Sequence, residues 1–144
     1  MSESFTKDLG TRVHKLACLM GRAAEQRLRA AGNLTFAQFR ILIAVLHGAK
    51  LNQRTIAQYH GLTEAAVSRM LATLQRQRLV RLVQDPANRR TNRLTLTPHG
   101  KRIAEDASRI LEGLFTHSFR RVSPTQRHSF LLTLDTLITG LTAT

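Results

Sequence analysis

The sequence of 144 residues contains no Trp, one Tyr, three Pro and a single Cys. One Cys excludes an intrachain disulfide framework, and this scarcity is typical of proteins from a reducing cytosol. No apolar run approaches the roughly 20 residues that a membrane-spanning helix requires. The first residues also lack the basic-then-apolar layout of a secretory signal. We therefore expect a cytoplasmic protein with no membrane partner.

Catalytic and metal-binding patterns are missing as well. The sequence has no paired carboxylates, no nucleophile motif and no Gly-rich phosphate loop. Its six His residues are scattered, without the short spacings that are typical of metal ligands. We therefore expect no enzymatic activity, no metal site and no cofactor.

Acidic residues are few, and their scarcity is uneven along the chain. Nine Asp and Glu against 22 Lys and Arg give a net charge of +13. The segment 50–102 alone has a net charge of +9, whereas residues 103–144 are neutral overall. A positive central segment is expected of a surface that neutralises phosphates, so double-stranded DNA is the predicted partner. A solvated basic face without a partner is the alternative.

Hydrophobic residues make up 42% of the chain, enough for a packed core, and their spacing predicts mainly helices. Gly32 and Gly48 are predicted helix stops. Thr35 with Gln38, and Ser123 with Gln126, are typical capping boxes at helix starts. The expected helices cover residues 5–31, 36–47, 53–60 and 63–78, then a segment from 98 onward and a last one from 124 to about 141.

The period changes at Leu79. Residues 79–84 and 93–97 have the alternation typical of strands, and the polar, basic segment 85–92 between them predicts a hairpin with a protruding tip. Two helices around a Gly61 turn, followed by such a hairpin, predict a winged helix-turn-helix lobe over residues 35–100. The fold class is therefore mainly α with a small β-hairpin wing, flanked by terminal dimerisation helices (5–31 and 103–141).

Helix 63–78 is the expected reading helix, because a duplex is read by residues near the start of a helix in the major groove. Arg69 suits the O6 and N7 atoms of guanine, and the methyl groups of Ala65 and Ala66 suit thymine. Glu64 suits cytosine, although favouring the positive helix start is its more ordinary role. The predicted DNA-contacting residues of this helix are Thr63, Ala65, Ala66, Ser68, Arg69, Thr73 and Arg76.

Two further groups are expected at the DNA. Gln53, Arg54 and Thr55 open the supporting helix and suit a phosphate clamp, although ordinary helix-start polarity also explains them. Arg89, Arg90 and Thr91 at the hairpin tip suit the DNA backbone or the minor groove. Asp85 is expected either to brace the wing by pairing with an arginine such as Arg89 or Arg93, or to act only as a turn former.

These motifs resemble the MarR family of regulators. The resemblance covers nearly the whole chain and is carried by Leu51-Asn-Gln-Arg-Thr-Ile-Ala57, Gly61-Leu-Thr-Glu-Ala-Ala-Val-Ser-Arg69, Leu79-Val80, Asp85-Pro-Ala-Asn-Arg-Arg90 and Leu94-Thr-Leu-Thr-Pro-His-Gly100. It implies a single domain over residues 1–144 that binds pseudo-palindromic operators as a dimer. It also implies repression of transcription until a small ligand, phenolic or similar, or an oxidant releases the DNA. Asn88 departs from the family, which commonly has Asp before the arginine pair.

The terminal helices carry more apolar surface than the lobe covers, which predicts a homodimer. Two-fold pairing would space the reading helices about 34–36 Å apart, one turn of DNA. A monomeric bundle that closes these stripes is the alternative. The predicted interface residues are Phe5, Leu9, Ile110, Leu114, Leu134, Leu137 and Ile138.

Regulation has two candidate forms, and the function itself has an alternative. A ligand in a cleft between the dimerisation helices and the DNA lobe would change the spacing of the reading helices. Cys18 is a possible redox sensor, although a small inert residue explains it better. The alternative to a specific repressor is a nucleoid-type protein that binds DNA without sequence preference because of its charge.

Overall fold

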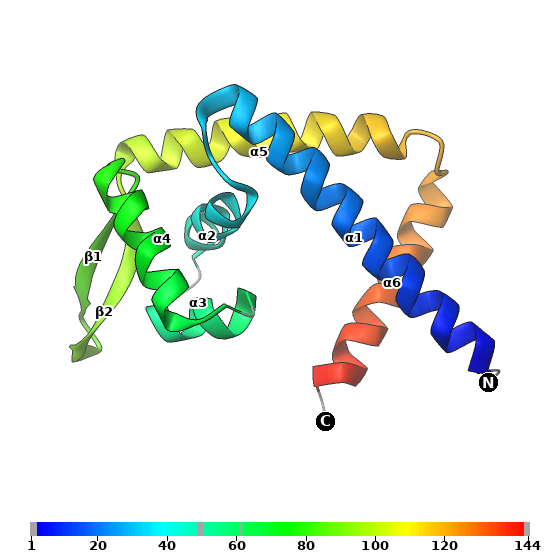
Figure 1. Ribbon diagram of the computed structural model, residues 1–144, viewed down its shortest axis with the longest axis horizontal. Helices are drawn as coiled ribbons and strands as arrows, with labels where there is room; N and C mark the ends of the chain where they lie inside the picture. Colours follow the sequence, from blue (N-terminus) through cyan, green and yellow to red (C-terminus); the bar gives the residue numbers. More distant parts are fainter. Residues whose placement is uncertain (1–2, 49–50, 61, 143–144) are drawn as a thin grey trace. The chain divides into compact units, whose positions relative to one another are not determined.

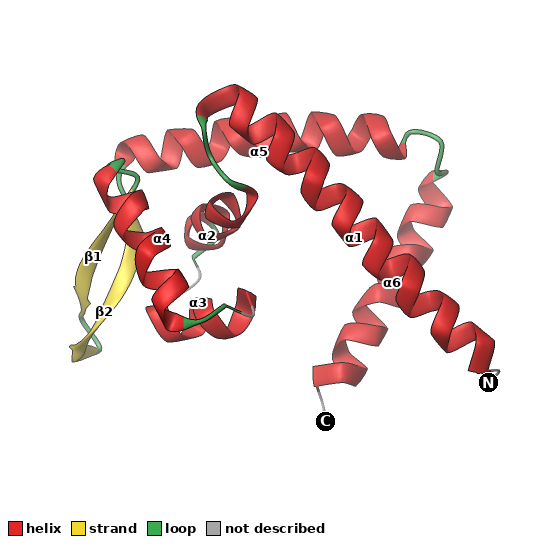
Figure 2. Cartoon of the chain, in the orientation of Figure 1, coloured by secondary structure: helices red, strands yellow, loops and turns green. Residues whose placement is uncertain are grey.

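The computed structural model describes residues 3–48, 51–60 and 62–142, without the side chains of residues 3–7, 59 and 88–91. The structure is mainly helical with one two-stranded antiparallel hairpin, which confirms the predicted fold class (Figures 1 and 2). In chain order the elements are α1 (Glu3–Gly32), α2 (Phe36–Leu46), α3 (Gln53–His60), α4 (Glu64–Arg76), β1 (Val80–Asp85), β2 (Asn88–Leu96), α5 (Pro98–Phe119) and α6 (Pro124–Thr142).

The chain divides into two compact units, Met1–Leu111 and Glu112–Thr144, which are called unit 1 and unit 2 below. Unit 1 holds α1 to α4, the hairpin and most of α5, and unit 2 holds the end of α5 and all of α6. The expectation of one domain over residues 1–144 stays a prediction.

The helices begin where the sequence predicts, because the caps are local hydrogen bonds. The Thr35 hydroxyl accepts from the Gln38 amide at 3.1 Å, and the Gln38 side chain accepts from the Thr35 amide at 2.9 Å. The Thr63 hydroxyl accepts from the Ala66 amide at 3.2 Å in the same way. Each bond satisfies a backbone donor that the first helical turn leaves without a partner.

Two helix ends differ from the prediction. α1 includes Gly32 as its last residue, and the next residue, Asn33, forms a left-handed cap with a φ of 57° and an amide bond to the Arg29 carbonyl (3.2 Å). The predicted stop at Gly32 was thus one residue early, because Asn also tolerates the left-handed conformation. α4 ends at Arg76, two residues before the predicted end, and Arg78 takes a φ of 55°.

The hairpin is longer than predicted. β1 pairs with β2 from Val80 and Leu96 to Gln84 and Asn92, and then jumps to Asp85 and Asn88. The expected loop over residues 85–92 was therefore wrong, because only Pro86 and Ala87 form the turn. A two-stranded ribbon has open faces, so a strand of polar residues shows none of the apolar alternation that marks a half-buried strand.

The core of unit 1 lies among α1 to α5 and the base of the hairpin. Leu28, Ile41, Leu42, Ile56 and Leu74 are almost fully buried. The predicted inward stripe of the reading helix is largely confirmed, since Val67, Leu71 and Leu74 are buried and Met70 is half-buried. This packing fixes which face of α4 turns outward.

Unit 2 is different, because none of the described residues of α6 is buried within the chain. Leu131, Leu132, Ile138 and Leu141 are more than half exposed. The start of α6 is held locally: Ser123 and Gln126 form the predicted capping box, with bonds of 3.0 and 3.3 Å. α6 thus presents apolar side chains that nothing in unit 2 covers.

Candidate nucleic-acid interface

α3 and α4 are joined as a helix-turn-helix. The Gln53 side-chain amide at the start of α3 donates to the Glu64 carbonyl at the start of α4 (3.1 Å). Across the turn, the Leu62 amide donates to the Ala57 carbonyl at 3.0 Å, while Gly61 itself lies outside the described residues. Ile56 of α3 and Val67 of α4 are buried at the junction. These contacts orient α4 relative to α3 and do not involve the outer face of α4.

The outer face of α4 carries the predicted reading residues. Ala65, Ser68, Arg69 and Arg76 are exposed, and Thr63 is exposed at the N-cap position. Ala66 and Thr73 are half-buried. The side chains of Ser68 and Arg69 have no intramolecular hydrogen bond among the described residues, so both are available to a partner.

The last turn of α4 has an internal network that the sequence did not predict. The Thr73 hydroxyl donates to the Arg69 carbonyl at 3.1 Å and accepts from Nη2 of Arg76 at 3.1 Å. Thr73 therefore holds the Arg76 guanidinium along the helix. This geometry gives Thr73 a positioning role toward Arg76, and its expected contact with DNA stays a prediction.

The predicted phosphate clamp at the start of α3 divides into two kinds of residue. The Thr55 hydroxyl donates to the Asn52 carbonyl at 2.9 Å, and the Gln53 amide is bonded to Glu64. Arg54 is exposed and has no hydrogen bond or ion pair with another described residue. Arg54 is thus the charged residue of the predicted clamp, and its side chain can turn to a phosphate.

The wing residues lie in an unusual part of the ladder. Between the Gln84–Asn92 and Asp85–Asn88 pairs, β2 advances four residues while β1 advances one, so residues 89–91 have no opposite partner. This bulge contains Arg89, Arg90 and Thr91, whose side chains lie outside the described part of the structure. The backbone therefore places both arginines near the end of the hairpin, as the sequence predicts.

Asp85 has a local partner. Its carboxylate accepts from the Ala87 amide at 2.9 Å, which is the bond of a turn former. Among the described residues no ion pair joins Asp85 to Arg93, so the structure does not bring this part of the predicted brace together. A bond to the Arg89 side chain lies outside the described residues.

Two cations near this surface were missed. Arg78 follows α4 and Arg81 lies on β1, and both are exposed. Helical and strand periodicity places them only at a helix end and on a strand. Their position could have indicated a contact with DNA, because both belong to the basic segment 50–102 and lie next to the reading helix.

His60 ends α3 beside this surface. Burial lowers the pKa of His60 below its ordinary value of 6.5, and the positive charge of Arg40 lowers it further. His60 is therefore neutral at pH 7 and adds no charge to the basic surface.

The predicted dimer residues lie in both units. In unit 1, Leu9 is half-buried and Ile110 is exposed; in unit 2, Leu114 and Leu134 are half-buried while Leu137 and Ile138 are exposed. The Phe5 side chain lies outside the described part. Cys18 is half-buried, with its Sγ 3.5 Å from Nε2 of His14. The dimer and the redox role stay predictions.

Neither a metal-binding cluster nor a membrane-spanning helix is found among the described residues. No group of three or more His, Cys, Asp or Glu side chains there could hold a metal ion. Within the same residues, no helix is both long enough and apolar enough to cross a membrane.

Comparison with known proteins agrees with this architecture. The fold is that of winged helix-turn-helix proteins, and the model of the MarR family matches residues 33–91. The helix-turn-helix and most of the wing are thus of the MarR type, which confirms the predicted resemblance. No curated protein matches the sequence.

Solved structures of regulators share the fold over nearly the whole chain. The transcriptional regulator BldR from Sulfolobus solfataricus is 22% identical, with a TM-score of 0.84 over 96% of this chain and 99% of that chain. CouR from Rhodococcus jostii RHA1, bound to p-coumaroyl-CoA, is 21% identical, with a TM-score of 0.79 over 94% and 95%. Apo MarR from E. coli is 19% identical, with a TM-score of 0.76 over 90% and 96%.

Proposed function

We propose that this protein is a sequence-specific DNA-binding transcription regulator that acts as a homodimer. The observation that carries the proposal is the outer face of α4, where Ser68 and Arg69 are exposed and unpaired within the described chain while the opposite face is buried. The MarR-type match of residues 33–91 supports the same class. Such a regulator needs no catalytic centre, so we propose no enzymatic activity.

The proposed binding mode places α4 in the major groove. Arg69 reads guanine through a forked contact, and Ser68 bonds to a neighbouring base or phosphate. Arg54 contacts a phosphate from the start of α3, where the positive end of the helix dipole adds to its charge. Arg89 and Arg90 follow the minor groove beside this site. Arg69 therefore supplies specificity, whereas the other arginines supply affinity.

The dimer is proposed from the uncovered apolar side chains of α6. Ile138 is 58% exposed and Leu141 is 80% exposed, an arrangement that water disfavours. Pairing of two chains through the terminal helices buries such side chains, as in other two-fold oligomers. A dimer then reads two half-sites of a pseudo-palindromic operator about 34–36 Å apart.

Repression with release by a small ligand is the proposed regulation, in the cytoplasm. CouR, a relative of the same fold, is bound to p-coumaroyl-CoA. A ligand releases DNA only if it binds the non-reading state more tightly than the reading state. The repressor role would follow if the operator overlaps the promoter of a neighbouring gene.

The test is protection of the upstream DNA of the chain's own gene. We expect a footprint with two protected half-sites related by two-fold symmetry, and specific binding roughly 10³-fold or more tighter than binding to random duplex. The Arg69→Ala chain should lose the footprint at concentrations where an exposed control, Arg120→Ala in unit 2, keeps it. A footprint without an inverted repeat would contradict the dimeric reading mode.

A nucleoid-type protein is the second candidate, favoured by the net charge of +13. It predicts a steep salt dependence and similar affinity for all duplexes, because phosphate contacts carry no sequence information. A third candidate is a thiol sensor, favoured by the 3.5 Å contact between Cys18 and His14. An unchanged peroxide response of operator binding in the Cys18→Ser chain would exclude the sensor.

A further inference from the structure

Glu25 of α1 makes a hydrogen bond to the start of α2. Its Oε2 atom accepts from the amide of Phe36, 11 residues further along the sequence, at 2.6 Å. Phe36 is the first residue of α2, so its amide is one of the donors that a helix start leaves without a partner inside the helix. The capping box satisfies the amides of Thr35 and Gln38, and Glu25 satisfies the donor that lies between them.

The charge of Glu25 also suits this position. α2 has no acidic residue in its own first turn, although the helix dipole favours a negative charge there. A hydrogen bond to an ionised acceptor is shorter and roughly twice as strong as one between neutral groups. One side chain of α1 therefore supplies both the acceptor for the Phe36 amide and the negative charge that the first turn of α2 lacks.

The ion pair between Glu25 and Arg29 is a lesser part of this contact. Nε of Arg29 is 2.7 Å from Oε1 of Glu25, and the two side chains are 57% and 33% exposed. Both residues belong to α1, so their pairing cannot hold α1 to α2, and ion pairs on a helix surface contribute little stability. The bond to Phe36 is thus the one that joins two helices.

Around Glu25, α1 is otherwise held by apolar side chains. Ala24 and Leu28 are almost fully buried, and a Cβ atom on Gly21 would lie 3.9 Å from Cδ1 of Phe36. Apolar contacts have no preferred direction, so they hold α1 in place without fixing its angle. A hydrogen bond weakens steeply when it is misaligned. We call Gly21, Glu25 and Phe36 the α1–α2 joint.

A change of angle at the α1–α2 joint would be amplified along α1. The predicted interface residue Leu9 lies about 24 Å from Glu25, because an α-helix rises about 1.5 Å per residue. A tilt of about 10° at the joint therefore moves Leu9 by roughly 4 Å, more than the rise of about 3.4 Å between base pairs of DNA. In a dimer that pairs through α1, a fixed angle at the joint keeps both reading helices in register with their half-sites.

We propose that Glu25 is a positioning residue, which fixes the direction of α1 on the winged helix-turn-helix lobe and thereby sets the half-site spacing that the dimer accepts. Glu25 acts through Phe36 and touches no DNA. The effect on spacing rests on the proposed function, a dimer that reads two half-sites, whereas the α1–α2 joint itself does not.

The first measurement compares operators of different spacing, made by inserting or removing one base pair between the half-sites that the footprint protects. The wild-type chain should bind the original spacing at least about ten-fold more tightly than either variant. Glu25→Ala should reduce this preference to about three-fold or less, because the direction of α1 is no longer fixed. Discrimination between single bases within a half-site should stay unchanged, because the outer face of α4 is intact. Glu25→Gln keeps an oxygen acceptor for the Phe36 amide and should restore most of the spacing preference.

Two controls separate the α1–α2 joint from the mere loss of a charge. Arg29→Gln removes the ion pair within α1 and leaves the bond to Phe36, so the spacing preference should stay. Glu105→Ala removes a carboxylate of α5 that lies 3.9 Å from Nζ of Lys101, and it should change neither spacing preference nor base discrimination. Loss of the spacing preference in either control overturns the proposal.

Hydrogen exchange of the Phe36 amide, followed by NMR without DNA, tests the joint itself. The wild-type amide should exchange at least about ten-fold more slowly than the same amide in the Glu25→Ala chain. Protected amides elsewhere in α2 show whether that chain is folded. If it is not, Glu25→Gln takes its place: its neutral acceptor makes a weaker bond, so Phe36 should exchange faster and the spacing preference should be smaller than in the wild type.

The outcomes distinguish the α1–α2 joint from the proposed function. An unprotected Phe36 amide in the wild-type chain overturns the joint. An unchanged spacing preference in a folded Glu25→Ala chain overturns the positioning role and leaves the proposed function standing. A wild-type chain that binds no operator overturns the proposed function together with the effect on spacing, and the exchange of the Phe36 amide still decides the joint.

Discussion

Gly100 packs directly against the backbone of Leu79. A Cβ atom on Gly100 would lie 1.8 Å from the Leu79 carbonyl oxygen and 2.7 Å from its carbonyl carbon. Thr97 completes this junction, because its amide donates to the same carbonyl at 3.0 Å and its hydroxyl accepts from the Gly100 amide at 2.9 Å. The first turn of α5 is thereby fixed to the point where α4 passes into the wing. This contact gives a physical reason for Thr97 and Gly100 in the segment Leu94-Thr-Leu-Thr-Pro-His-Gly100.

Gly100→Ala should therefore destabilise the fold. The obstructing atoms belong to the backbone of Leu79, so no side chain can move aside, and overpacking of this kind costs about 1–3 kcal/mol. Gly113→Ala in the same helix is the matched control, because a Cβ there meets nothing within 4 Å. Removing that helical glycine should stabilise by roughly 0.5–1 kcal/mol. Urea unfolding of both variants and of the wild-type chain at one protein concentration measures the change in the free energy of unfolding that each substitution causes. The two changes should differ in sign.

The end of α4 leads to a second prediction. Arg78 has a φ of 55°, and the Leu79 and Arg78 amides bond to the carbonyls of Leu74 and Gln75 at 2.9 Å, which is a Schellman cap. Glycine takes this left-handed conformation without the cost that a Cβ brings, about 1–2 kcal/mol. Arg78→Gly should therefore raise the free energy of unfolding. Gln77→Gly, one residue earlier with a φ of −74°, should lower it. Equal effects of the two substitutions would contradict the assigned cap.

Arg78→Gly should also lower the affinity for DNA. Arg78 is an exposed cation beside the reading helix, so the more stable Arg78→Gly chain should bind all duplexes slightly more weakly. If Arg78 contacts a phosphate, the slope of log affinity against log salt should fall by roughly one unit.

Local features of the fold could be predicted because their causes are local. The cap at Thr35 and the inward stripe of α4 depend on residues three or four positions apart, and a sequence shows such spacings directly. The hairpin register could not be predicted. Nothing in the polar run from Asn88 to Asn92 distinguishes a bulged strand from a loop, because a run of polar residues shows no alternation of apolar and polar positions.

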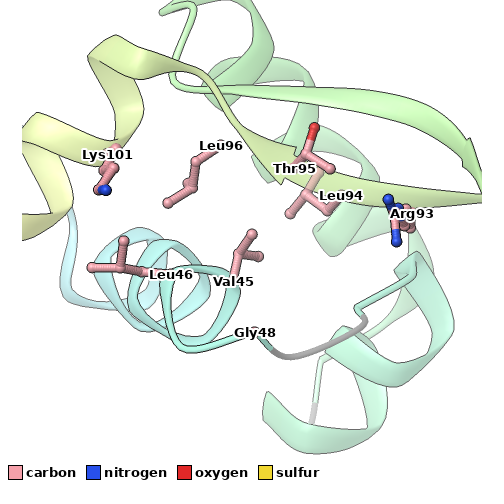
Figure 3. A pocket seen from close by; sticks show the side chains of 8 residues that line it. All are labelled: Val45, Leu46, Gly48, Arg93, Leu94, Thr95, Leu96 and Lys101. Atoms are coloured by element: carbon pink, nitrogen blue, oxygen red, sulfur yellow. The ribbon is translucent and has the colours of Figure 1, made fainter.

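In the candidate site, too, only the features with local causes could be predicted from the sequence. Arg69 could be placed on the outer face of α4 by periodicity alone. The role of Thr73 in holding Arg76 depends on side-chain rotamers, which periodicity does not report. The pocket that Val45 and Leu46 of α2 form with Leu94 and Leu96 of β2 (Figure 3) depends on segments more than 40 residues apart in the sequence. No local sequence pattern shows that α2 and β2 lie next to each other.

Substitutions of Arg69 and of Arg54 should affect DNA binding in different ways. Arg69→Ala should cost about 1–3 kcal/mol of discrimination at one base position, because a forked guanine contact is lost. Arg54→Ala should weaken binding to every sequence alike and reduce the salt slope by roughly one unit. Binding isotherms on the operator, on single-base variants and on random duplex, each at several salt concentrations, separate the two. A uniform loss in the Arg69→Ala chain would remove Arg69 from base reading.

His60 predicts how stability depends on pH. Its pKa in the folded chain is lowered by burial and by the Arg40 charge, from an ordinary value of 6.5. Below about pH 6.5 the unfolded chain therefore binds a proton at this residue that the folded chain does not, so stability falls as the pH falls. The contribution is fully present above pH 6.5 and is lost as the pH drops through the folded value. Urea unfolding at several pH values should show a shallower acid loss in the His60→Gln chain.

Arg40 provides the control for this assignment. Arg40→Gln removes a neighbouring positive charge and should raise the pKa of His60 toward its ordinary value, whereas Arg40→Lys keeps the charge and should leave it lowered. The ring proton of His60, followed by NMR through the titration, reports the pKa directly. A His60 pKa at or above 6.5 in the wild-type chain would contradict the burial that the structure assigns to this ring.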